Sequence, residues 1–411
     1  MEVYLVGGAV RDELLGLPVE ERDWCVVGAT PDELEALGYR GVGKHFPVFL
    51  HPKTHEEYAL ARTERKTSGG YHGFAFYTSS DVTIEQDLKR RDLTINAMAK
   101  NTDGNLIDPY KGFDDLKNKI LRHVSTAFSE DPVRILRVAR FAARFAGRGF
   151  TIADETVQLM RQIVINGEAD TLSPERIWLE TGKVLGGESP HVFFQTLRHC
   201  GALKTVFPEL DALFGIPQPK KWHPEIDCGI HTIMVLEQAA KLSDDVDVRF
   251  AALVHDLGKA TTPKNKLPHH VGHEKRTSAI IQKMSLRLPI PKACRELAKL
   301  AAQFHTHCHR AFELRPTTIL DVLERTDAFR RPERFEKFLV VCEADARGRT
   351  GFENRDYPQT DYFRAALNTA QQIDTTEFSS EEVDGTVIRK KLRATRIDAL
   401  EKFKTSYEPP K

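Results

Sequence analysis

The pattern of apolar residues changes near residue 125, and this change limits the folds that the chain can adopt. Before it, Glu2–Val6 and Arg22–Val27 have the length and residue types of strands, and turn residues separate them. Further strands are expected at Pro47–Leu50 and Glu57–Arg62. From Asp131 onward the apolar residues recur at helical spacing almost to the C-terminus. The sequence therefore predicts an α/β domain followed by a mostly α-helical remainder.

The composition is that of a globular protein without an overall charge. The chain has 411 residues, enough for roughly two or three domains, and 59 Lys and Arg balance 59 Asp and Glu. This balance excludes a globally basic nucleic-acid coat, so binding to a polyanion needs a local patch. No apolar run approaches the ~18 residues of a membrane span, and the first residues lack a signal-peptide pattern. Six scattered cysteines favour a reducing compartment, so we expect a cytoplasmic protein.

A glycine turn and a pair of acidic residues lie close together near the N-terminus. Gly7 and Gly8 lie between a predicted strand and a predicted helix, where backbone amides can face a phosphate, and Arg11 follows one turn later. Glu21 and Asp23 stand two residues apart at the start of the next strand, so they share a face. Two close carboxylates repel each other unless a cation lies between them, and Mg²⁺ prefers oxygen ligands. The segment fits two-metal nucleotidyl transfer, with an ordinary turn and a solvated strand end as the alternative.

A row of arginines follows in residues 130–150. Asp131 and Pro132 suit the first turn of a helix. The arginines then recur at helical spacing within about a third of the helix circumference: Arg134, Arg137, Arg140, Arg144 and Arg148. The last four have no acidic residue four positions away, and arginine is suited to bidentate contacts with phosphates and base edges. We therefore expect this row, with Arg90 and Arg91, to bind an anion or a nucleotide rather than to form solvated surface.

Asp131 and Arg134 allow a sharper prediction. A carboxylate only accepts hydrogen bonds and a guanidinium only donates them. Together they match a base edge that offers an amino donor beside a ring-nitrogen acceptor, which cytosine and adenine present and uracil and guanine reverse. If the pair faces the base, it admits CTP and ATP and rejects UTP and GTP, because a wrong base leaves buried polar groups unpaired.

Several motifs along the chain carry a resemblance to a known family. They are GGAVRDELLG, ERDW, HEEYALARTERK, LKRRDLTINAMA, EDPVRILRVARFAARF, KWHPEIDCGIHT and HDLGK, in the order of that family. The chain resembles the bacterial class II tRNA nucleotidyltransferases, the CCA-adding enzymes, in their long multifunctional form with a His–Asp (HD) hydrolase domain.

The resemblance implies an α/β head of the polymerase-β-like nucleotidyltransferase fold, followed by a mostly α-helical neck, body, HD domain and tail. We expect the nucleotidyltransferase head over residues 1–125 and a neck and body with nucleotide-selecting and RNA-binding residues over residues 126–220. The HD phosphohydrolase domain is expected over residues 228–329 and the helical tail over residues 330–411.

The resemblance also implies template-independent addition and repair of the 3′-terminal CCA of tRNA, with CTP, ATP and Mg²⁺. It implies Glu21 and Asp23 as catalytic metal ligands, Asp131 and Arg134 as the protein template, and nucleotide binding at these residues: Gly8, Arg11, Arg91, Arg137 and Arg140. The expected partner is tRNA, bound at its acceptor stem and elbow by a monomer or homodimer, with no membrane involved. The family normally has Asp at the position of Glu21. The extra methylene shifts the ion by about an ångström, a displacement that can cost ~10²-fold in rate.

A second group of candidate metal ligands lies in the helical part of the chain. His255 and Asp256 are adjacent in LVHDLGK, and His231 precedes them. Imidazole and carboxylate can bind a transition metal or Mg²⁺ that activates water for phosphoester hydrolysis, whereas buried core histidines are the alternative. His305 is a further candidate ligand, as are His269, His270 and His273.

The resemblance implies phosphatase, 2′-nucleotidase and 2′,3′-cyclic phosphodiesterase activities that depend on Ni²⁺ or Mg²⁺. Many HD domains complete the ligand set with an aspartate on a later helix, which we expect directly after His305. The chain has Thr306 there, so the motifs support hydrolysis less strongly than nucleotidyl transfer.

Other functions remain open at this point. A bacterial poly(A) polymerase shares the head motifs but usually has a basic C-terminal extension. A phosphohydrolase with an inactive transferase head is compatible with Glu21, and a non-catalytic tRNA-binding protein is the third alternative.

Overall fold

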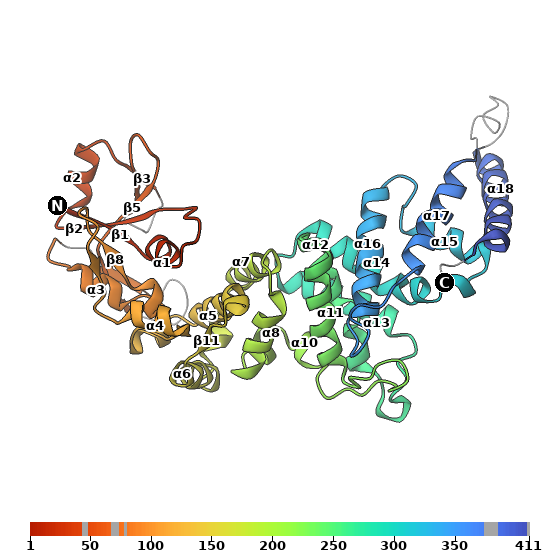
Figure 1. Cartoon of the computed structure of the whole chain (residues 1–411), viewed down its shortest axis with the longest axis horizontal. Helices are drawn as coiled ribbons and strands as arrows, with labels where there is room; N and C mark the ends of the chain where they lie inside the picture. The colour runs from red at the N-terminus through yellow and green to blue at the C-terminus, as the bar shows by residue number, and fades with distance from the viewer. Residues whose placement is uncertain (43–47, 67–73, 78–79, 374–384, 409–411) are drawn as a thin grey trace. The chain divides into compact units, whose positions relative to one another are not determined.

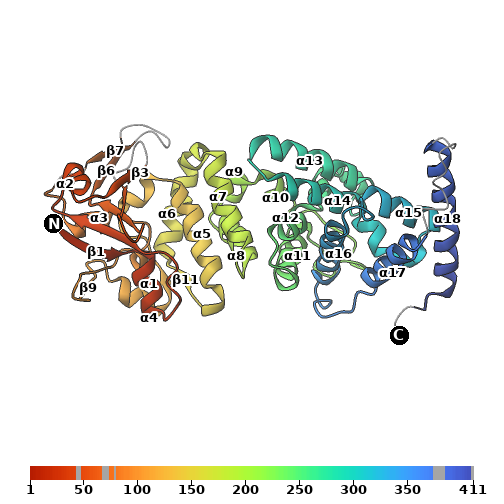
Figure 2. The same ribbon diagram turned by 90° about the horizontal axis from the view of Figure 1, so that it is seen from above.

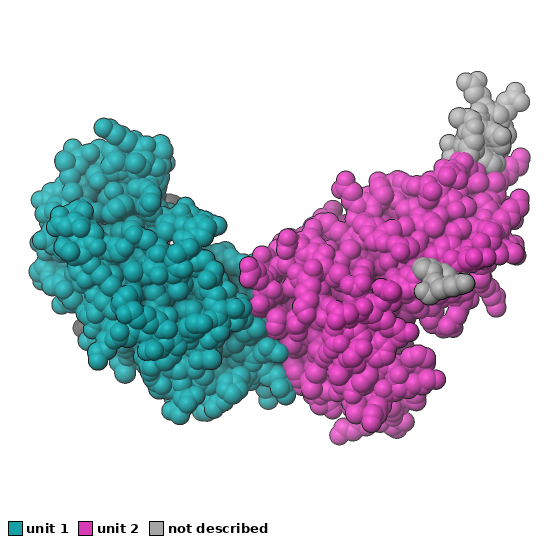
Figure 3. Space-filling model, viewed as in Figure 1, with its two compact units in different colours: residues 1–184, 192–206 teal, residues 185–191, 207–411 magenta. Residues whose placement is uncertain are grey.

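The computed structural model describes residues 1–42, 48–66, 74–77, 80–373 and 385–408. The chain divides into two compact units, which Figure 3 shows in teal and magenta. Unit 1 consists of residues 1–184 and 192–206, and unit 2 of residues 185–191 and 207–411. In the described part of the chain no helix is both long and apolar enough to cross a membrane.

A mixed sheet forms the centre of the N-terminal part of unit 1 (Figure 1). Among the described residues it has seven strands in the order β3-β4-β5-β2-β1-β8-β9. Their bounds are β1 Glu2–Val6, β2 Asp23–Val27, β3 Arg40–Val42, β4 Val48–Leu50, β5 Glu57–Leu60, β8 Ala99–Lys100 and β9 Leu106–Ile107. β6 Thr63–Lys66 pairs with β7 Phe74–Tyr77, and β10 Ile120–Leu121 pairs with β11 Thr151–Ile152.

The predicted strands are found with small shifts. β1 has its predicted bounds and runs antiparallel to β2, with Val6 opposite Asp23. β2 begins at Asp23, so Glu21 lies before the strand and not in it. β5 ends at Leu60, and Pro47, where the next predicted strand began, lies outside the described residues.

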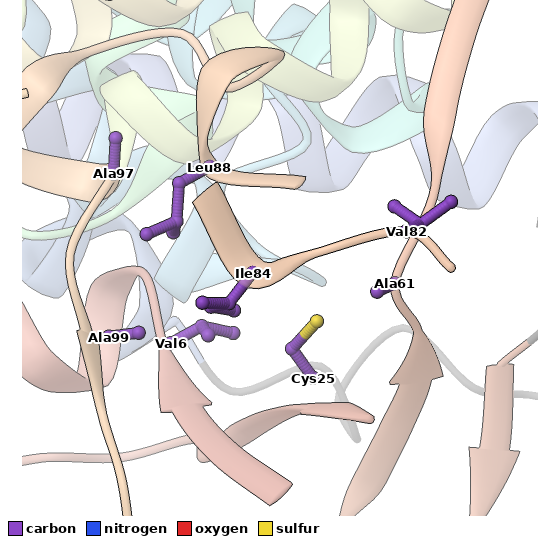
Figure 4. Packing of buried hydrophobic residues seen from close by; sticks show 8 residues of the cluster. All are labelled: Val6, Cys25, Ala61, Val82, Ile84, Leu88, Ala97 and Ala99. Atoms are coloured by element: carbon purple, nitrogen blue, oxygen red, sulfur yellow. The ribbon is translucent and has the colours of Figure 1, made fainter. Parts of the chain in front are cut away.

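Alternating side chains of the sheet contribute to two apolar clusters. Cys25 packs with Val6 and with Ile84 and Leu88 of α3 Ile84–Lys89, as Figure 4 shows. The next residue along β2, Val26, belongs to the other cluster with Leu34 of α2 Pro31–Ala36. Asp23 therefore has the same orientation along β2 as Cys25, toward the side that α3 covers.

Both covering helices begin at capping boxes, in which a threonine side chain accepts from a backbone N–H three residues later. Thr30 with Glu33 begins α2, and Thr83 with Gln86 begins α3. The other helices of the described part of residues 1–206 are α1 Gly8–Leu14, α4 Gly112–Asn118, α5 Val133–Phe145, α6 Asp154–Ile165, α7 Pro174–Leu185, α8 Pro190–His199 and α9 Leu203–Val206.

The start of α5 differs from its prediction. Asp131 has extended backbone angles and Pro132 is the N-cap, so Asp131 precedes the helix instead of lying in its first turn. Its side chain accepts from the backbone N–H of Val133 (3.1 Å). At the start of α7, Pro174 is the first helical residue, and Ser173 accepts from the N–H of Arg176 (3.4 Å).

The described residues of unit 2 from 207 onward are helical. The helices are α10 Pro208–Asp211, α11 Cys228–Leu242, α12 Val246–Val254, α13 His273–Arg287, α14 Lys292–His309, α15 Pro316–Arg325, α16 Pro332–Arg347, α17 Gln359–Gln371 and α18 Gly385–Ser406. Helices α11, α12, α14 and α16 pack against one another, and α13 packs on α14 and on the 3₁₀ helix η5 Leu257–Thr261 (Figure 2). The prediction of an α/β domain followed by a mostly helical remainder is confirmed.

Candidate functional site

A cavity of about 660 Å³ lies within unit 1. The residues that the resemblance implied as catalytic or nucleotide-binding all line it: Gly8, Arg11, Glu21, Asp23, Arg91, Asp131, Arg134, Arg137 and Arg140. The lining residues as a whole come from the turn after β1, helix α1, the start of β2, the end of α3, and helices α5 and α7. The described lining holds ten basic and five acidic residues, so the cavity suits a polyanion although the chain is neutral.

The two acidic residues near β2 form one edge of this cavity. Glu21 and Asp23 are both exposed to it. Partial desolvation raises the pKa of Asp23; Arg91 opposes the shift, and the charge of Glu21 adds to it. A divalent cation between the two carboxylates would relieve this repulsion, and their oxygens are the ligands that Mg²⁺ prefers.

The glycine turn approaches the same edge closely. Gly7 has a φ of 69°, in the left-handed region that favours glycine. A Cβ atom at Gly7 would lie 2.6 Å from Nη1 of Arg91, so a larger residue would displace this arginine. The turn thus keeps the Arg91 guanidinium beside the start of α1.

The arginines of α5 are neutralised by carboxylates from other elements. These carboxylates are not at i±4 on the same helix, so the spacing along α5 gave no sign of them. The pairs are Arg137 with Asp92 (2.7 Å), Arg140 with Glu180 (2.5 Å) and Arg144 with Asp12 (3.1 Å). Arg148 lies beyond the end of α5 and does not line the cavity.

Asp92 and Arg11 line the cavity and belong to networks of ion pairs and hydrogen bonds. Asp92 is buried and accepts from Asn96 (2.9 Å) and Arg137 (2.7 Å). Burial opposes the charge of Asp92, but Arg137 and Asn96 outweigh it and lower its pKa. Arg11 is buried, donates twice to Asp12 at 2.9 Å, and lies over the Phe141 ring at 5.1 Å. Its guanidinium is therefore held in one place before any ligand binds.

Asp131 is held by an arginine that the sequence analysis missed. Arg176 of α7 donates from Nη1 to Oδ1 (3.0 Å) and from Nη2 to Oδ2 (2.6 Å), a bidentate pair. Arg134 lines the same cavity and donates to the carbonyl of Ala127 (2.7 Å). No motif near Arg176 in the sequence indicates a partner 45 residues away.

Unit 2 contains a buried cluster of histidines and aspartates. His231 lies on α11, His255 and Asp256 follow α12, and His305 lies on α14. Asp345 of α16 completes the cluster, with Oδ1 at 3.0 Å from His231 Nε2 and Oδ2 at 3.5 Å from His255 Nε2. Within this cluster, sets of three such residues have ligand atoms within 4.8 Å of one another.

The hydrogen bonds of these rings fit a cation. His255 Nδ1 lies 2.8 Å from the carbonyl of Ala252, which can only accept, so Nε2 carries the lone pair in the neutral ring. That Nε2 faces Asp256 Oδ2 at 3.2 Å and has no hydrogen-bond partner among the described residues. His231 is arranged in the same way, with Nδ1 at 2.9 Å from the carbonyl of Gly348. Lone pairs that face carboxylates in a buried site are the donor set of a divalent metal.

Three family models match the chain in this order. Residues 3–122 match the Poly A polymerase head domain, residues 149–214 a model described as a probable RNA and SrmB-binding site of polymerase A, and residues 229–345 the HD domain. A multifunctional CCA protein of Thioalkalivibrio sulfidiphilus (strain HL-EbGR7) is 60% identical over 407 residues, 99% of this chain and 100% of that protein. Another, of Hahella chejuensis (strain KCTC 2396), is 54% identical over 409 residues, 100% of this chain and 97% of that protein.

The chain belongs to the family of multifunctional CCA proteins. It is a CCA-adding nucleotidyltransferase that carries an HD domain, so the resemblance seen in the sequence is confirmed. The fold is also that of a solved Thermotoga maritima CCA-adding enzyme complexed with tRNA. Its TM-score is 0.62 at 18% identity, and the match covers 99% of this chain and 92% of that one.

In this CCA protein the last aspartate of the HD cluster is not where the sequence analysis looked for it. The expected position, directly after His305, is occupied by Thr306, whose hydroxyl donates to Glu274 (3.3 Å). Asp345 supplies the carboxylate instead, beyond the boundary expected at residue 329 and at the end of the HD-domain match. No short motif surrounds Asp345, so only its place on α16 shows its role.

The remaining predicted histidines separate into two groups. His273 joins the cluster, with Nε2 at 3.2 Å from Asp256 Oδ1. His270 is buried but contacts Thr262 and the carbonyl of Pro217, and His269 is exposed.

The charges of the HD cluster follow from burial and pairing. Burial opposes ionisation of Asp256, but the ammonium group of Lys259 outweighs it and holds the pKa of this carboxyl well below its usual range. Burial lowers the pKa of His305 to about 3, so this ring is neutral at physiological pH and can offer a nitrogen lone pair to a metal ion. Lys259 is itself paired, with Nζ at 2.6 Å from Asp256 Oδ2.

Proposed function

We propose that this CCA protein builds and repairs the 3′-terminal CCA of tRNA by taking CTP and ATP, one at a time, into the cavity of unit 1. The observation that carries the proposal is that one cavity combines the Glu21 and Asp23 carboxylates with Asp131 and Arg134. The first pair would hold Mg²⁺ and the second would contact the base. That a homologous fold is solved with tRNA supports tRNA as the acceptor.

The basic lining would hold the triphosphate. Gly8 contributes a backbone amide at the start of α1, and these side chains contribute positive charge around it: Arg11, Arg91, Arg137 and Arg140. Because Asp12, Asp92 and Glu180 already position three of these guanidiniums, little side-chain entropy is lost when the nucleotide binds. Mg²⁺, when bound, would lower the pKa of the attacking hydroxyl and neutralise charge on the phosphates.

The base would be selected by protein alone. Asp131 accepts and Arg134 donates, which matches the pairing edges of cytosine and adenine. With UTP or GTP, Asp131 would face another acceptor and Arg134 another donor. Polar groups left unpaired in this way in a desolvated cavity cost about 1–3 kcal/mol each.

The test is incorporation of each nucleoside triphosphate, with Mg²⁺, into tRNA that lacks its last three nucleotides. The proposal requires addition of C, C and A and no use of UTP or GTP. A run of A without C would identify a poly(A) polymerase, and no pyrophosphate release from CTP would mean an inactive head. Asp131→Ala should admit UTP and GTP; unchanged base selection would reject the template role of Asp131.

A second function is proposed for unit 2, from the convergence of His231, His255, Asp256 and Asp345. We infer a metal-dependent phosphohydrolase that acts as phosphatase, 2′-nucleotidase and 2′,3′-cyclic phosphodiesterase, with His305 as a further ligand. A metal bound there would activate water. Nitrogen-rich donors favour Ni²⁺ over Mg²⁺.

These hydrolytic activities would clean damaged RNA 3′ ends before CCA repair. Their test is release of phosphate from 2′-AMP, and opening of 2′,3′-cyclic AMP, by protein treated with a chelator and then reloaded with Ni²⁺ or Mg²⁺. Activity that survives chelation would reject a metal-dependent site.

A further inference from the structure

The loop that follows α16 is attached to the HD cluster at both of its ends. Gly348, which ends α16, offers its carbonyl to Nδ1 of His231 at 2.9 Å. At the other end of the loop, the hydroxyl of Tyr357 lies 2.7 Å from Nδ1 of His309, and Nε2 of the same ring lies 2.7 Å from Oδ2 of Asp345. The residues between Gly348 and Tyr357 are therefore held beside the buried cluster.

This loop places two arginines around one aromatic ring. The guanidinium carbons of Arg349 and Arg355 each lie 5.1 Å from the centre of the Phe352 ring. Arg349 also donates to the backbone carbonyls of Ala346 (2.9 Å) and Trp222 (3.3 Å). These contacts hold the guanidiniums in place and leave their positive charge intact, because neither an aromatic ring nor a carbonyl carries a net charge.

A second segment, just before α11, places a tryptophan beside the first of these arginines. Trp222 is 58% exposed, and Nζ of Lys221 lies 4.8 Å from the centre of its ring. Lys220 is exposed as well. The next residue, His223, packs its ring on that of His231, with the ring centres 4.7 Å apart. Trp222 is therefore one residue along the chain from a contact with the cluster, and its ring remains open to solvent.

The acidic residues of these two segments do not cancel the positive charge. Glu225 accepts from the N–H of Thr350 (3.4 Å), and Glu353 accepts from the N–H of Gly351 (3.0 Å), so both are used within the protein. Asp356 is exposed. Four basic side chains surround the exposed tryptophan: Lys220, Lys221, Arg349 and Arg355.

An exposed aromatic face combined with positive charge is the arrangement by which proteins bind single-stranded nucleic acid. The bases stack on the aromatic ring, and the phosphates contact the basic groups. An acidic peptide would be attracted by the same charges, but it offers no flat ring to cover the indole of Trp222. A single-stranded RNA offers both, and its 3′ end carries the phosphoester on which the neighbouring cluster would act.

We propose that a surface for the single-stranded 3′ end of RNA lies beside the hydrolase site of unit 2. This Trp222 surface consists of five residues: Lys220, Lys221, Trp222, Arg349 and Arg355. The terminal phosphate lies at the HD cluster, the preceding base stacks on Trp222, and the preceding phosphates contact the basic side chains. The inference rests on the hydrolase function proposed for unit 2 and names its substrate class, an oligonucleotide rather than a mononucleotide. Stacking and phosphate contacts do not read the base, so the surface accepts any 3′ sequence.

The experiment compares two substrates of one reaction on full-length protein loaded with Ni²⁺. They are 2′,3′-cyclic AMP and a tetraribonucleotide that ends in a 2′,3′-cyclic phosphate, and opening of the cyclic phosphate is measured for both. The parent should prefer the tetraribonucleotide by kcat/KM, and the preference should decrease as salt is added. Trp222→Ala should reduce the preference roughly 5- to 100-fold, mainly through a higher KM for the tetraribonucleotide, because base stacking is lost. Trp222→Phe should retain most of the preference.

The double variant Arg349→Ala, Arg355→Ala should lower both the preference and its salt dependence, because phosphate contacts are lost. Arg330→Ala is the matched control, at an arginine whose side chain is 81% exposed and paired with Asp327, and it should keep the preference of the parent.

Equal use of the two substrates by the parent, or a preference that survives Trp222→Ala, would overturn the Trp222 surface and leave the proposed hydrolase standing. Opening of neither substrate would overturn both proposals. Inhibition of tetraribonucleotide opening by polyglutamate as strongly as by single-stranded DNA would overturn RNA as the partner and indicate an acidic protein.

Discussion

Arg176 determines which part of Asp131 is available to a base. Oδ1 of Asp131 accepts from the N–H of Val133 and from Arg176, and Oδ2 accepts from Arg176. A carboxylate oxygen has two lone pairs, so one lone pair of Oδ2 is left for an amino group. Arg176 is thus a positioning residue for the proposed template.

Arg176→Lys should relax base selection, because a lysine can replace the charge of Arg176 but not its two parallel hydrogen bonds. Loss of a hydrogen bond to a charged group costs about 1.5–3 kcal/mol, so discrimination between CTP and UTP should fall roughly 10- to 100-fold. The measurement is the ratio of kcat/KM for the two nucleotides on truncated tRNA. Arg161→Lys, at an exposed arginine that contacts His199, is the control. An unchanged ratio in Arg176→Lys would show that Asp131 does not need this partner.

Asp92→Asn should destabilise unit 1 most strongly at neutral pH. The folded state lowers the pKa of Asp92 below its usual value of 3.8. The stabilisation that ionised Asp92 gives to the folded state is therefore complete above the usual pKa and is lost as the pH falls through the folded-state pKa. Asp92 is buried but the Arg137 side chain is 39% exposed to solvent, which screens the pair, so removing the charge costs about 1–3 kcal/mol. Unfolding by urea at pH 7 and pH 3.5 should show a difference from the parent that shrinks at the lower pH. Asp103→Asn, at an exposed aspartate, should show no difference, and an equal effect at both pH values would contradict the assignment.

At the scale of elements, helices α12, α13, α14 and α16 depend on one another through the HD cluster. Each contributes at least one residue of the cluster or precedes one directly, so a displacement of one helix changes the cluster. At Gly258 of η5, a Cβ atom would lie 2.3 Å from the carbonyl oxygen of His273 and 2.6 Å from the N atom of Thr277, both on α13.

Gly258→Ala should therefore displace α13 and destabilise unit 2. The clash is with backbone atoms, which cannot rotate away, and overpacking of this kind costs about 1–3 kcal/mol. Differential scanning calorimetry should show a lower unfolding temperature for one transition, and bound Mn²⁺ should decrease. Gly182→Ala in α7, where a Cβ would meet nothing within 4 Å, should be neutral or stabilising. A Gly258→Ala protein with unchanged calorimetry would show that η5 and α13 separate easily.

At the scale of the whole molecule, each compact unit contains its own site. The carboxylates and arginines of the nucleotide cavity all belong to unit 1, and the HD cluster lies in unit 2. The two proposed activities therefore share no described residue.

Asp23→Ala should abolish CCA addition and leave phosphohydrolase activity intact, whereas Asp256→Ala should do the reverse. Each substitution removes a metal ligand of one site without touching the other. Both activities are measured on both proteins, with truncated tRNA and with 2′,3′-cyclic AMP. Loss of both activities in either variant would argue against independent sites.

The sequence alone determined the order of an α/β domain and a helical remainder, the strand β1 and the family. These features depend on local patterns or on motifs that are contiguous in the chain, such as GGAVRDELLG and HDLGK. Only the tertiary structure decided the partners: Arg176 for Asp131, Asp92 for Arg137, and Asp345 for His231 and His255. An ion pair or a shared ligand site requires proximity in space, and residues far apart in the chain acquire it only when their helices pack.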